Sequence, residues 1–175
     1  MTGDTISVTE RLVLRRITPD DAPFILELLN EPSFLEFIGD KGVRNLDDAR
    51  HYILTGPVAS YDRHGFGLYL VLLKPGDVPI GSCGLLQRNI LPDVDIGYAL
   101  RPAFWGQGYA FEAASAVLAH GREVFGLRRI VAITSPANAA SKALLEKLGL
   151  RYERTLSLSS ENDTDLFAIE APGAP

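Results

Sequence analysis

The sequence predicts a single mixed α/β domain, and three observations support this class. Short apolar runs typical of strands alternate along the chain with segments that carry helix start and stop signals. A composition of 46% hydrophobic and 22% charged residues is ordinary for a globular protein. The length of 175 residues suffices for one substantial core and gives no reason to expect two.

The N-terminal third is predicted to hold one strand and two helices. Residues 10–17 (ERLVLRRI) have the pattern of a strand. A helix then begins after Thr18, a good N-cap residue, with Pro19 at the first helical position. Asn45 is expected to be the N-cap of a second helix in the same way. The segment 31–43 between the two helices is rich in both aromatic and turn residues.

The middle of the chain is predicted to hold most of the sheet. Three strand-like runs follow one another at 66–73, 80–88 and 94–100, the first two separated by a strong turn signal. A helix is expected over 108–123, because small apolar residues recur there with a period of 3.6. The dense apolar run 128–134 is typical of a strand in the middle of a sheet.

The C-terminal part is predicted to hold a short helix and a closing hairpin. The helix covers 138–149 and ends at a glycine, the residue favoured just after a helix end. Two strands, 151–158 and 164–170, are expected to pair around a turn at 161–163. The loose-looking segments 1–8 and 171–175 leave one domain over 9–170.

Charge and cysteine content exclude several function classes. The net charge is −5 and the arginines occur in ones and twos, so no nucleic-acid-binding surface is expected. Cys83 is the only cysteine, which excludes an intrachain disulfide, and no His, Asp or Glu grouping has metal-ligand spacing. No apolar run approaches ~18 residues and no leader pattern is present, so we expect no membrane segment and a cytoplasmic location.

The stretch FWGQGYAFEA (104–113) places two glycines at the start of a predicted helix. Bare N–H groups, the helix dipole and missing Cβ atoms make such a start a candidate anion site. A dinucleotide fingerprint would need a small residue in place of Phe111 and an acid after the strand 128–134, and both are missing. A Walker A loop fails as well, because Tyr109 and Ala110 stand where Lys and Ser or Thr are needed. A plain strand-to-helix turn is the structural alternative.

Two motifs together carry a family resemblance. The stretch 105–110 fits Gln/Arg-x-x-Gly-x-Gly/Ala except that Trp takes the first place. Farther along, Asn138 and Ser141 fit Asn-x-x-Ser, and 148–150 reads Leu-Gly-Leu where the pattern has Leu-Gly-aromatic. In this order the motifs resemble the GNAT superfamily of acyl-CoA-dependent N-acetyltransferases. A Trp at the first place is typical of its RimJ/RimL-like branch, and the likeness spans about 9–170.

The resemblance implies a fold and an activity. The fold is a central mixed, mostly antiparallel sheet of about six to seven strands flanked by about four helices, with splayed strands forming an acyl-CoA cleft. The activity is direct transfer of an acetyl group from acetyl-CoA to a primary amine, either a protein N-terminus or a small molecule such as a polyamine or an antibiotic. A non-catalytic acyl-CoA-binding sensor or scaffold of the same fold is the alternative. Related enzymes often dimerise, so a homodimer is also expected.

The resemblance also assigns coenzyme contacts. Amides near the end of strand 94–100 would face the thioester carbonyl, the helix start would hold the pyrophosphate, and the second motif would contact pantetheine. The residues are Ala99, Leu100, Gly106, Gln107, Gly108, Tyr109, Ala110, Asn138 and Ser141. Asn138 is equally explained as the cap of its helix.

Direct transfer needs one group to accept a proton from the ammonium and another to protonate the departing thiolate. Ser141 stands where relatives often have the acid, although it could be only a polar residue of the first helical turn. Asp95 is the leading base, because relatives use an acid on this strand through a water. The acids that remain open for the base are Glu112, Glu161 and Asp165, and each has solvated surface as its alternative.

The acceptor pocket is expected to be lined by the segment 30–44. Phe34, Phe37 and Ile38 are its candidate walls, although Phe34 could equally belong to the core.

Overall fold

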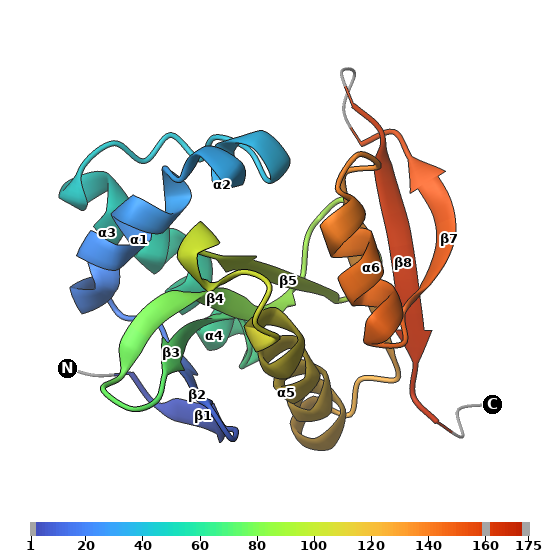
Figure 1. Ribbon diagram of the computed structural model, residues 1–175, viewed down its shortest axis with the longest axis horizontal. Helices are drawn as coiled ribbons and strands as arrows, with labels where there is room; N and C mark the ends of the chain where they lie inside the picture. Colours follow the sequence, from blue (N-terminus) through green and yellow to red (C-terminus); the bar gives the residue numbers. More distant parts are fainter. Residues whose placement is uncertain (1–2, 159–161, 173–175) are drawn as a thin grey trace.

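The computed structural model describes residues 3–158 and 162–172. They form one mixed α/β fold around an eight-stranded sheet in the order β1-β2-β3-β4-β5-β6-β8-β7, in which only β5 and β6 run parallel (Figure 1). The strands are β1 (Thr5–Val8), β2 (Leu12–Arg16), β3 (Leu68–Leu73), β4 (Val78–Leu86), β5 (Asp95–Leu100), β6 (Arg129–Thr134), β7 (Arg151–Leu156) and β8 (Thr164–Glu170). The α-helices are α1 (Ala22–Leu29), α2 (Pro32–Phe37), α3 (Leu46–Ile53), α4 (Ala59–His64), α5 (Tyr109–Phe125) and α6 (Ala139–Lys147).

The N-terminal region holds more regular structure than the sequence predicts. The segment 1–8 was expected to be loose, yet Thr5–Val8 forms an edge strand that pairs with β2. The residues of β1 are exposed or half-buried, so the sequence there shows no apolar run that would predict a strand. The strand is defined by its pairing with β2. The helices α2 and α4 raise the number above the expected four. Each has six residues, too few for a 3.6-residue period to be visible.

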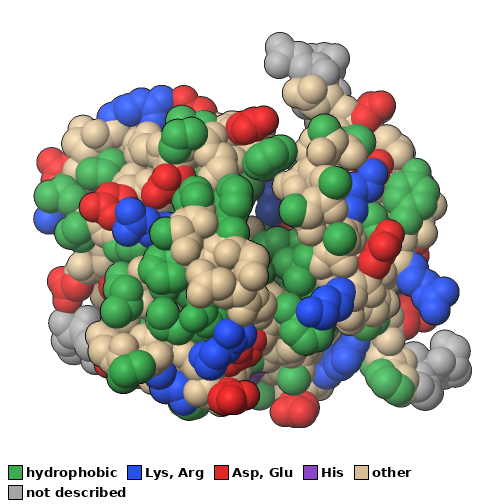
Figure 2. All heavy atoms as spheres, viewed as in Figure 1, with side chains coloured by type: hydrophobic (Ala, Val, Ile, Leu, Met, Phe, Trp, Pro, Cys, Tyr) green, Lys and Arg blue, Asp and Glu red, His purple; other side chains and the backbone are tan. Residues whose placement is uncertain are grey.

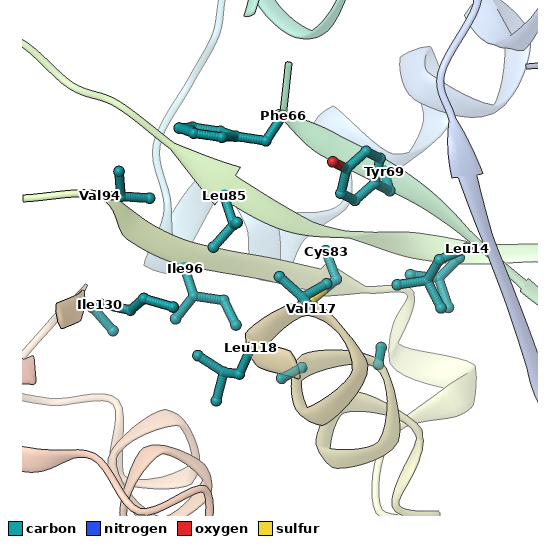
Figure 3. Packing of buried hydrophobic residues seen from close by; sticks show 14 of the residues in the cluster. Leu14, Phe66, Tyr69, Cys83, Leu85, Val94, Ile96, Val117, Leu118 and Ile130 are labelled. Atoms are coloured by element: carbon teal, nitrogen blue, oxygen red, sulfur yellow. The ribbon is translucent and has the colours of Figure 1, made fainter. Parts of the chain in front are cut away.

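Helices cover both faces of the N-terminal half of the sheet. On one face α5 packs Val117 and Leu118 against the strands, close to Cys83 and Ile96 (Figure 3). On the other face α1 and α3 pack against the alternate residues of β3, Leu70 and Leu72. Because both faces of these strands are buried, their sequences are nearly continuous apolar runs.

Cys83 lies in the centre of the larger core cluster and is 0% exposed. Burial raises the pKa of its thiol well above the usual range. Cys83 is therefore a buried thiol that stays protonated.

The C-terminal half of the sheet consists of β6, β8 and β7 with α6 on one face (Figure 1). The predicted hairpin is confirmed, since β7 and β8 pair antiparallel from Arg151↔Ala168 to Leu156↔Thr164. Glu161 lies outside the described residues.

The two halves of the sheet meet only where β5 and β6 begin. The register between these strands consists of the single pair Asp95↔Val131, supported by the hydrogen bond from the Val131 N–H to the Val94 carbonyl at 3.0 Å. Beyond this pair the strands diverge, and the molecular surface is hollowed between the halves (Figure 2). The predicted splayed strands are therefore present.

In the part of the chain that the structure describes, no helix has the length and apolar character needed to cross a membrane.

Replacing Gly84 with alanine is expected to lower the free energy of unfolding by about 3 kcal/mol, at the upper end of the usual cost of overpacking. A Cβ at this position would lie 2.0 Å from the carbonyl oxygen of Gly67 and 2.6 Å from the Cα of Leu68. Both are backbone atoms of the neighbouring chain segment, so they cannot yield without disturbing the sheet. Urea denaturation followed by circular dichroism measures the change. Gly56→Ala is the matched control, because a Cβ there meets nothing within 4 Å. Equal losses in the two variants would contradict this account.

Candidate active site

The glycine-containing loop leads from β5 into α5. Gly106 and Gly108 have φ angles of 73° and 82°, values that residues with a Cβ rarely adopt. Gly108 is the N-cap residue of α5, and the indole N–H of Trp105 donates to the Leu100 carbonyl at 2.9 Å, which ties the loop to the sheet. The first N–H groups of α5 lack partners within the helix, and the helix dipole adds positive potential. The loop thus has the backbone geometry of helix starts that bind anions.

Arg11, the residue just before β2, supports this loop, and no local pattern in the sequence marks it. Its Nη1 donates to the Gln107 carbonyl at 2.9 Å and its Nε to the Glu112 carboxylate at 2.7 Å. Its guanidinium lies 4.4 Å from the centre of the Tyr109 ring. The hydroxyl of Thr9 donates to the same carboxylate at 2.6 Å. Arg11, Glu112 and Thr9 fasten the N-terminal hairpin to the start of α5.

Glu112 is therefore an anchor and not a free base. Burial raises the pKa of its carboxyl, but the hydrogen bonds from Thr9 and Arg11 outweigh burial and leave the pKa below its usual value.

An open groove beside the loop is lined by Thr9, Arg11, Phe111 and Lys147 among others. The ammonium of Lys147 lies 4.4 Å from the centre of the Phe111 ring, so two cations border the groove.

The register of β5 decides which of its amides can face the cleft. Arg101 N–H donates to the Ile80 carbonyl at 2.9 Å, and Ser82 is paired with Ala99 in the same ladder. Since hydrogen-bonded pairs alternate along an antiparallel ladder, the Ala99 amide faces β4 and not the cleft. The amides of Leu100 and Tyr98 face the diverging β6. The prediction that the Ala99 amide faces the thioester carbonyl is therefore wrong. The same prediction stands for the Leu100 amide, and the Tyr98 amide is a further candidate.

Asp95 lies at the point where β5 and β6 part. It is 1% exposed, and its two carboxylate oxygens accept hydrogen bonds from Arg88 Nε at 3.1 and 3.2 Å. Burial raises the pKa of Asp95 to about 6, although Arg88 acts in the opposite direction. Alternation along the strand puts Asp95 on the same face as Ala99, which packs against the cluster around α1 and α3.

The other acids considered for the base are engaged in structural contacts. Asp165 is buried, accepts a hydrogen bond from Thr155 and pairs with Lys142 at 3.2 Å. Asp93, the other acid near the start of β5, pairs with Arg129 at 3.1 Å. Of the acids that the structure describes, Asp95 alone combines a raised pKa with a place where β5 and β6 part.

The second motif lies at the start of α6, across the cleft. Asn138 is the N-cap residue, and its side-chain oxygen accepts the Ser141 N–H at 3.1 Å, so the predicted capping role is confirmed. The Ser141 hydroxyl lies 2.7 Å from the hydroxyl of Tyr98 on β5. Burial raises the pKa of Tyr98 to about 12, which keeps its phenol protonated. A contact between residues 43 positions apart has no local signal in the sequence.

The predicted acceptor-pocket residues differ in exposure. Phe34 is 7% exposed and packs in the cluster with α1 and α3, so it belongs to the core. Phe37 and Ile38 are 38% and 47% exposed at the end of α2. Of the three residues, these two remain candidates for a pocket wall.

Among the described residues, no group of three or more His, Cys, Asp or Glu side chains could hold a metal ion.

The chain matches the family model described as the acetyltransferase (GNAT) domain over residues 11–151. It is 29% identical to the uncharacterized N-acetyltransferase YoaA of Bacillus subtilis over 171 residues, which cover 94% of this chain and 96% of YoaA. It is also 29% identical over 151 residues to the uncharacterized N-acetyltransferase p20 of Bacillus licheniformis, with 85% and 83% covered.

Solved structures show the same fold. An acetyltransferase from Agrobacterium tumefaciens superposes with a TM-score of 0.81 at 25% identity, covering 98% of this chain and 96% of that one. RimL, described as the ribosomal L7/L12 alpha-N-protein acetyltransferase and solved in complex with coenzyme A, superposes with a TM-score of 0.81 at 20% identity, covering 95% and 98%. With the family model covering most of its length, the chain belongs to the GNAT family and is an acetyltransferase.

Proposed function

We propose that this enzyme transfers an acetyl group from acetyl-CoA directly to a primary amine. The observation that carries the proposal is the cleft between β5 and β6. A glycine loop at a helix start lies at its mouth, a buried carboxylate with a raised pKa lies where the strands part, and a hydrogen-bonded pair of hydroxyls lies across it. The coenzyme A complex of the similar RimL fold supports coenzyme A as the carrier.

The loop residues fit a pyrophosphate. Positive φ angles at Gly106 and Gly108 turn the loop so that the amides of Gln107, Tyr109 and Ala110 can converge on an anion. A Cβ on Gly106 would meet no protein atom within 4 Å, so the space beside it is open. Acetyl-CoA supplies the acetyl group as a thioester. The cleft-facing amides of Tyr98 and Leu100 are suited to stabilise the negative charge that develops on the thioester oxygen.

The two proton movements are divided between the two faces of β5. Asp95 lies on the face covered by α1 and α3, and we assign it the acceptance of a proton from the ammonium through one water. Tyr98 lies on the face of α5 and, with Ser141, is assigned protonation of the departing sulfur. The Asn138 side chain holds α6 so that Ser141 meets Tyr98, and we assign it contact with pantetheine as well.

The acceptor is a protein N-terminus or a small amine, and Phe37 and Ile38 are its proposed contacts. Release of free thiol from acetyl-CoA in the presence of a panel of amines tests the proposal. The panel compares short peptides that have free N-termini with polyamines and aminoglycosides. Coenzyme A binding without thiol release for any amine would favour a non-catalytic acyl-CoA-binding module instead.

Gly106→Val is expected to weaken coenzyme A binding at least about tenfold, because the side chain would fill the open space assigned to the phosphates. Gly126→Val is the matched control. Gly126 also has a positive φ, 64°, and open space around its Cβ, but it lies at the other end of α5. Both variants bear similar backbone strain, so titration calorimetry separates the local effect from a general loss of stability. Equal affinities in the two variants would disprove the cradle.

Asp95→Asn is expected to lower kcat by about 10²-fold while coenzyme A affinity is preserved. The wild-type rate should fall as the pH drops through about 6, because the raised pKa leaves Asp95 protonated, and unable to accept a proton, below that value. The residual rate of Asp95→Asn should lack this step. A pH profile of kcat/KM measures both effects, and an unchanged step in the variant assigns it to another group.

Ser141→Ala and Tyr98→Phe are each expected to lower kcat by about 10²-fold with little change in the KM for acetyl-CoA. The two hydroxyls act as one hydrogen-bonded unit, so the double variant should be scarcely slower than either single variant. Steady-state kinetics on the four proteins measures this. A single variant within twofold of the wild-type kcat would remove that residue from the mechanism.

A further inference from the structure

We infer that Arg88 is a positioning residue for the proposed base: it holds the Asp95 carboxylate by both oxygens and thereby sets the range of pH in which the enzyme works. The inference rests on the proposed function, because it concerns the regulation of the same site. Arg88 lies in the segment 87–94, which joins β4 to β5, and Asp95 is the first residue after this segment.

The contact between Arg88 and Asp95 engages the whole carboxylate. Nε of Arg88 lies 3.1 Å from Oδ1 and 3.2 Å from Oδ2 of Asp95, so both oxygens share a single N–H donor. Each oxygen keeps a lone pair that can accept a hydrogen bond from a water. Arg88 therefore orients the carboxylate without using up its capacity to receive a proton.

The segment 87–94 is also attached to the far half of the sheet. The N–H of Leu91 donates to the Arg88 carbonyl at 3.3 Å, which closes a turn. The side chain of Leu91 is 6% exposed and packs with Val131 of β6. Arg88 thus has a defined place beside the point where β5 and β6 part, and this place does not depend on its contact with Asp95 alone.

The burial of Asp95 is what makes its charged partner important. Asp95 is 1% exposed, whereas the side chain of Arg88 is 36% exposed. Burial raises the pKa of Asp95 to about 6, and both the charge of Arg88 and its hydrogen bond act against this increase. Without Arg88 the effect of burial would be unopposed, so the carboxyl would keep its proton to a higher pH. Arg88 therefore keeps the proposed base ionised near neutral pH.

The other charged groups near the start of β5 have partners of their own. Asp93 pairs with Arg129 at 3.1 Å, and Arg129 also holds Glu153 at 2.7 Å. The terminal nitrogens of Arg88 donate to no residue that the structure describes, so its charge is not divided between two carboxylates. Within the described residues, the charged contact of Asp95 is with Arg88 alone.

Lys41 and Tyr52 are the other groups on which the charge of Arg88 acts. Burial, and after it the charge of Arg88, lower the pKa of the Lys41 ammonium, which lies between α2 and α3. Burial raises the pKa of the Tyr52 phenol on α3, and Arg88 acts against this increase. Loss of Arg88 would therefore change these two groups as well, and the experiment includes Lys41→Gln and Tyr52→Phe to separate their effects.

The experiment is a pH profile of kcat/KM for the wild-type enzyme and for Arg88→Gln. Glutamine keeps a hydrogen-bond donor but removes the positive charge. We expect the step near pH 6 to move upward by at least about one pH unit in the variant, the usual effect of losing an opposite charge beside a carboxylate. Above the new step the rate of the variant should recover. The same amine is used throughout, so its own ionisation contributes equally to every profile.

Four further variants serve as controls. Arg88→Lys retains a positive charge, so its step should remain close to the wild-type value. Arg129→Gln is the matched control, because it removes the arginine that pairs with the neighbouring Asp93 and should leave the step in place. Lys41→Gln and Tyr52→Phe should leave it in place too. A merely structural role of Arg88 predicts the same loss of rate at every pH with no movement of the step, and that result would overturn the inference. A step that moves as far in any of the other three controls would overturn it as well.

A titration that needs no acceptor separates this inference from the proposed function. The carboxyl ¹³C resonance of Asp95, identified by its absence in Asp95→Asn, is followed against pH by NMR spectroscopy. The pKa of Asp95 should be higher in Arg88→Gln than in the wild-type protein. If it is higher and no amine is acetylated, the control of Asp95 by Arg88 stands and only the transfer reaction is disproved. If it is unchanged, the inference is overturned even where amines are acetylated.

Discussion

The separation of β5 from β6 is the constraint on which the rest of the structure depends. Two parallel strands that paired along their whole length would close the sheet and leave no passage between its faces. Here they share the single pair Asp95↔Val131. Because the strands then diverge, backbone amides in the middle of a well-packed domain remain available to a ligand. The two halves still share one apolar cluster, which includes Cys83 and Ile96 on one side and Ile130 and Phe167 on the other, so the opening lies in a domain that remains packed as one.

Because of this opening, the two faces of β5 offer different chemical environments. Successive residues of β5 point to opposite sides, so a carboxylate at Asp95 and a phenol at Tyr98 work in separate environments although they are three residues apart. On one side the carboxylate is desolvated and tied to a guanidinium. On the other side the phenol is held by the first turn of α6. The proton acceptor and the proton donor that we propose can therefore coexist without neutralising each other.

Local signals predicted much of this arrangement, and the rest depends on contacts between distant residues. Asn138 was predicted as a cap and the glycines as special backbone because both properties depend on neighbouring residues alone. The partnership of Tyr98 with Ser141 and the support from Arg11 join segments far apart in the chain, and no local pattern marks them. The assignment of the Ala99 amide was wrong because the phase of a β ladder is set by pairing with β4, which the sequence of β5 does not specify.

The bond network of Thr9, Arg11 and Glu112 joins residues about a hundred positions apart. The loop to which we assign the coenzyme is consequently held by contacts between distant parts of the chain, and its support depends on the first hairpin being docked on α5. Ligand occupancy and docking of this hairpin are then thermodynamically linked, because a ligand that binds the closed form stabilises it by mass action. Amide hydrogens of the first two strands are therefore expected to exchange more slowly when a ligand occupies the distant helix start.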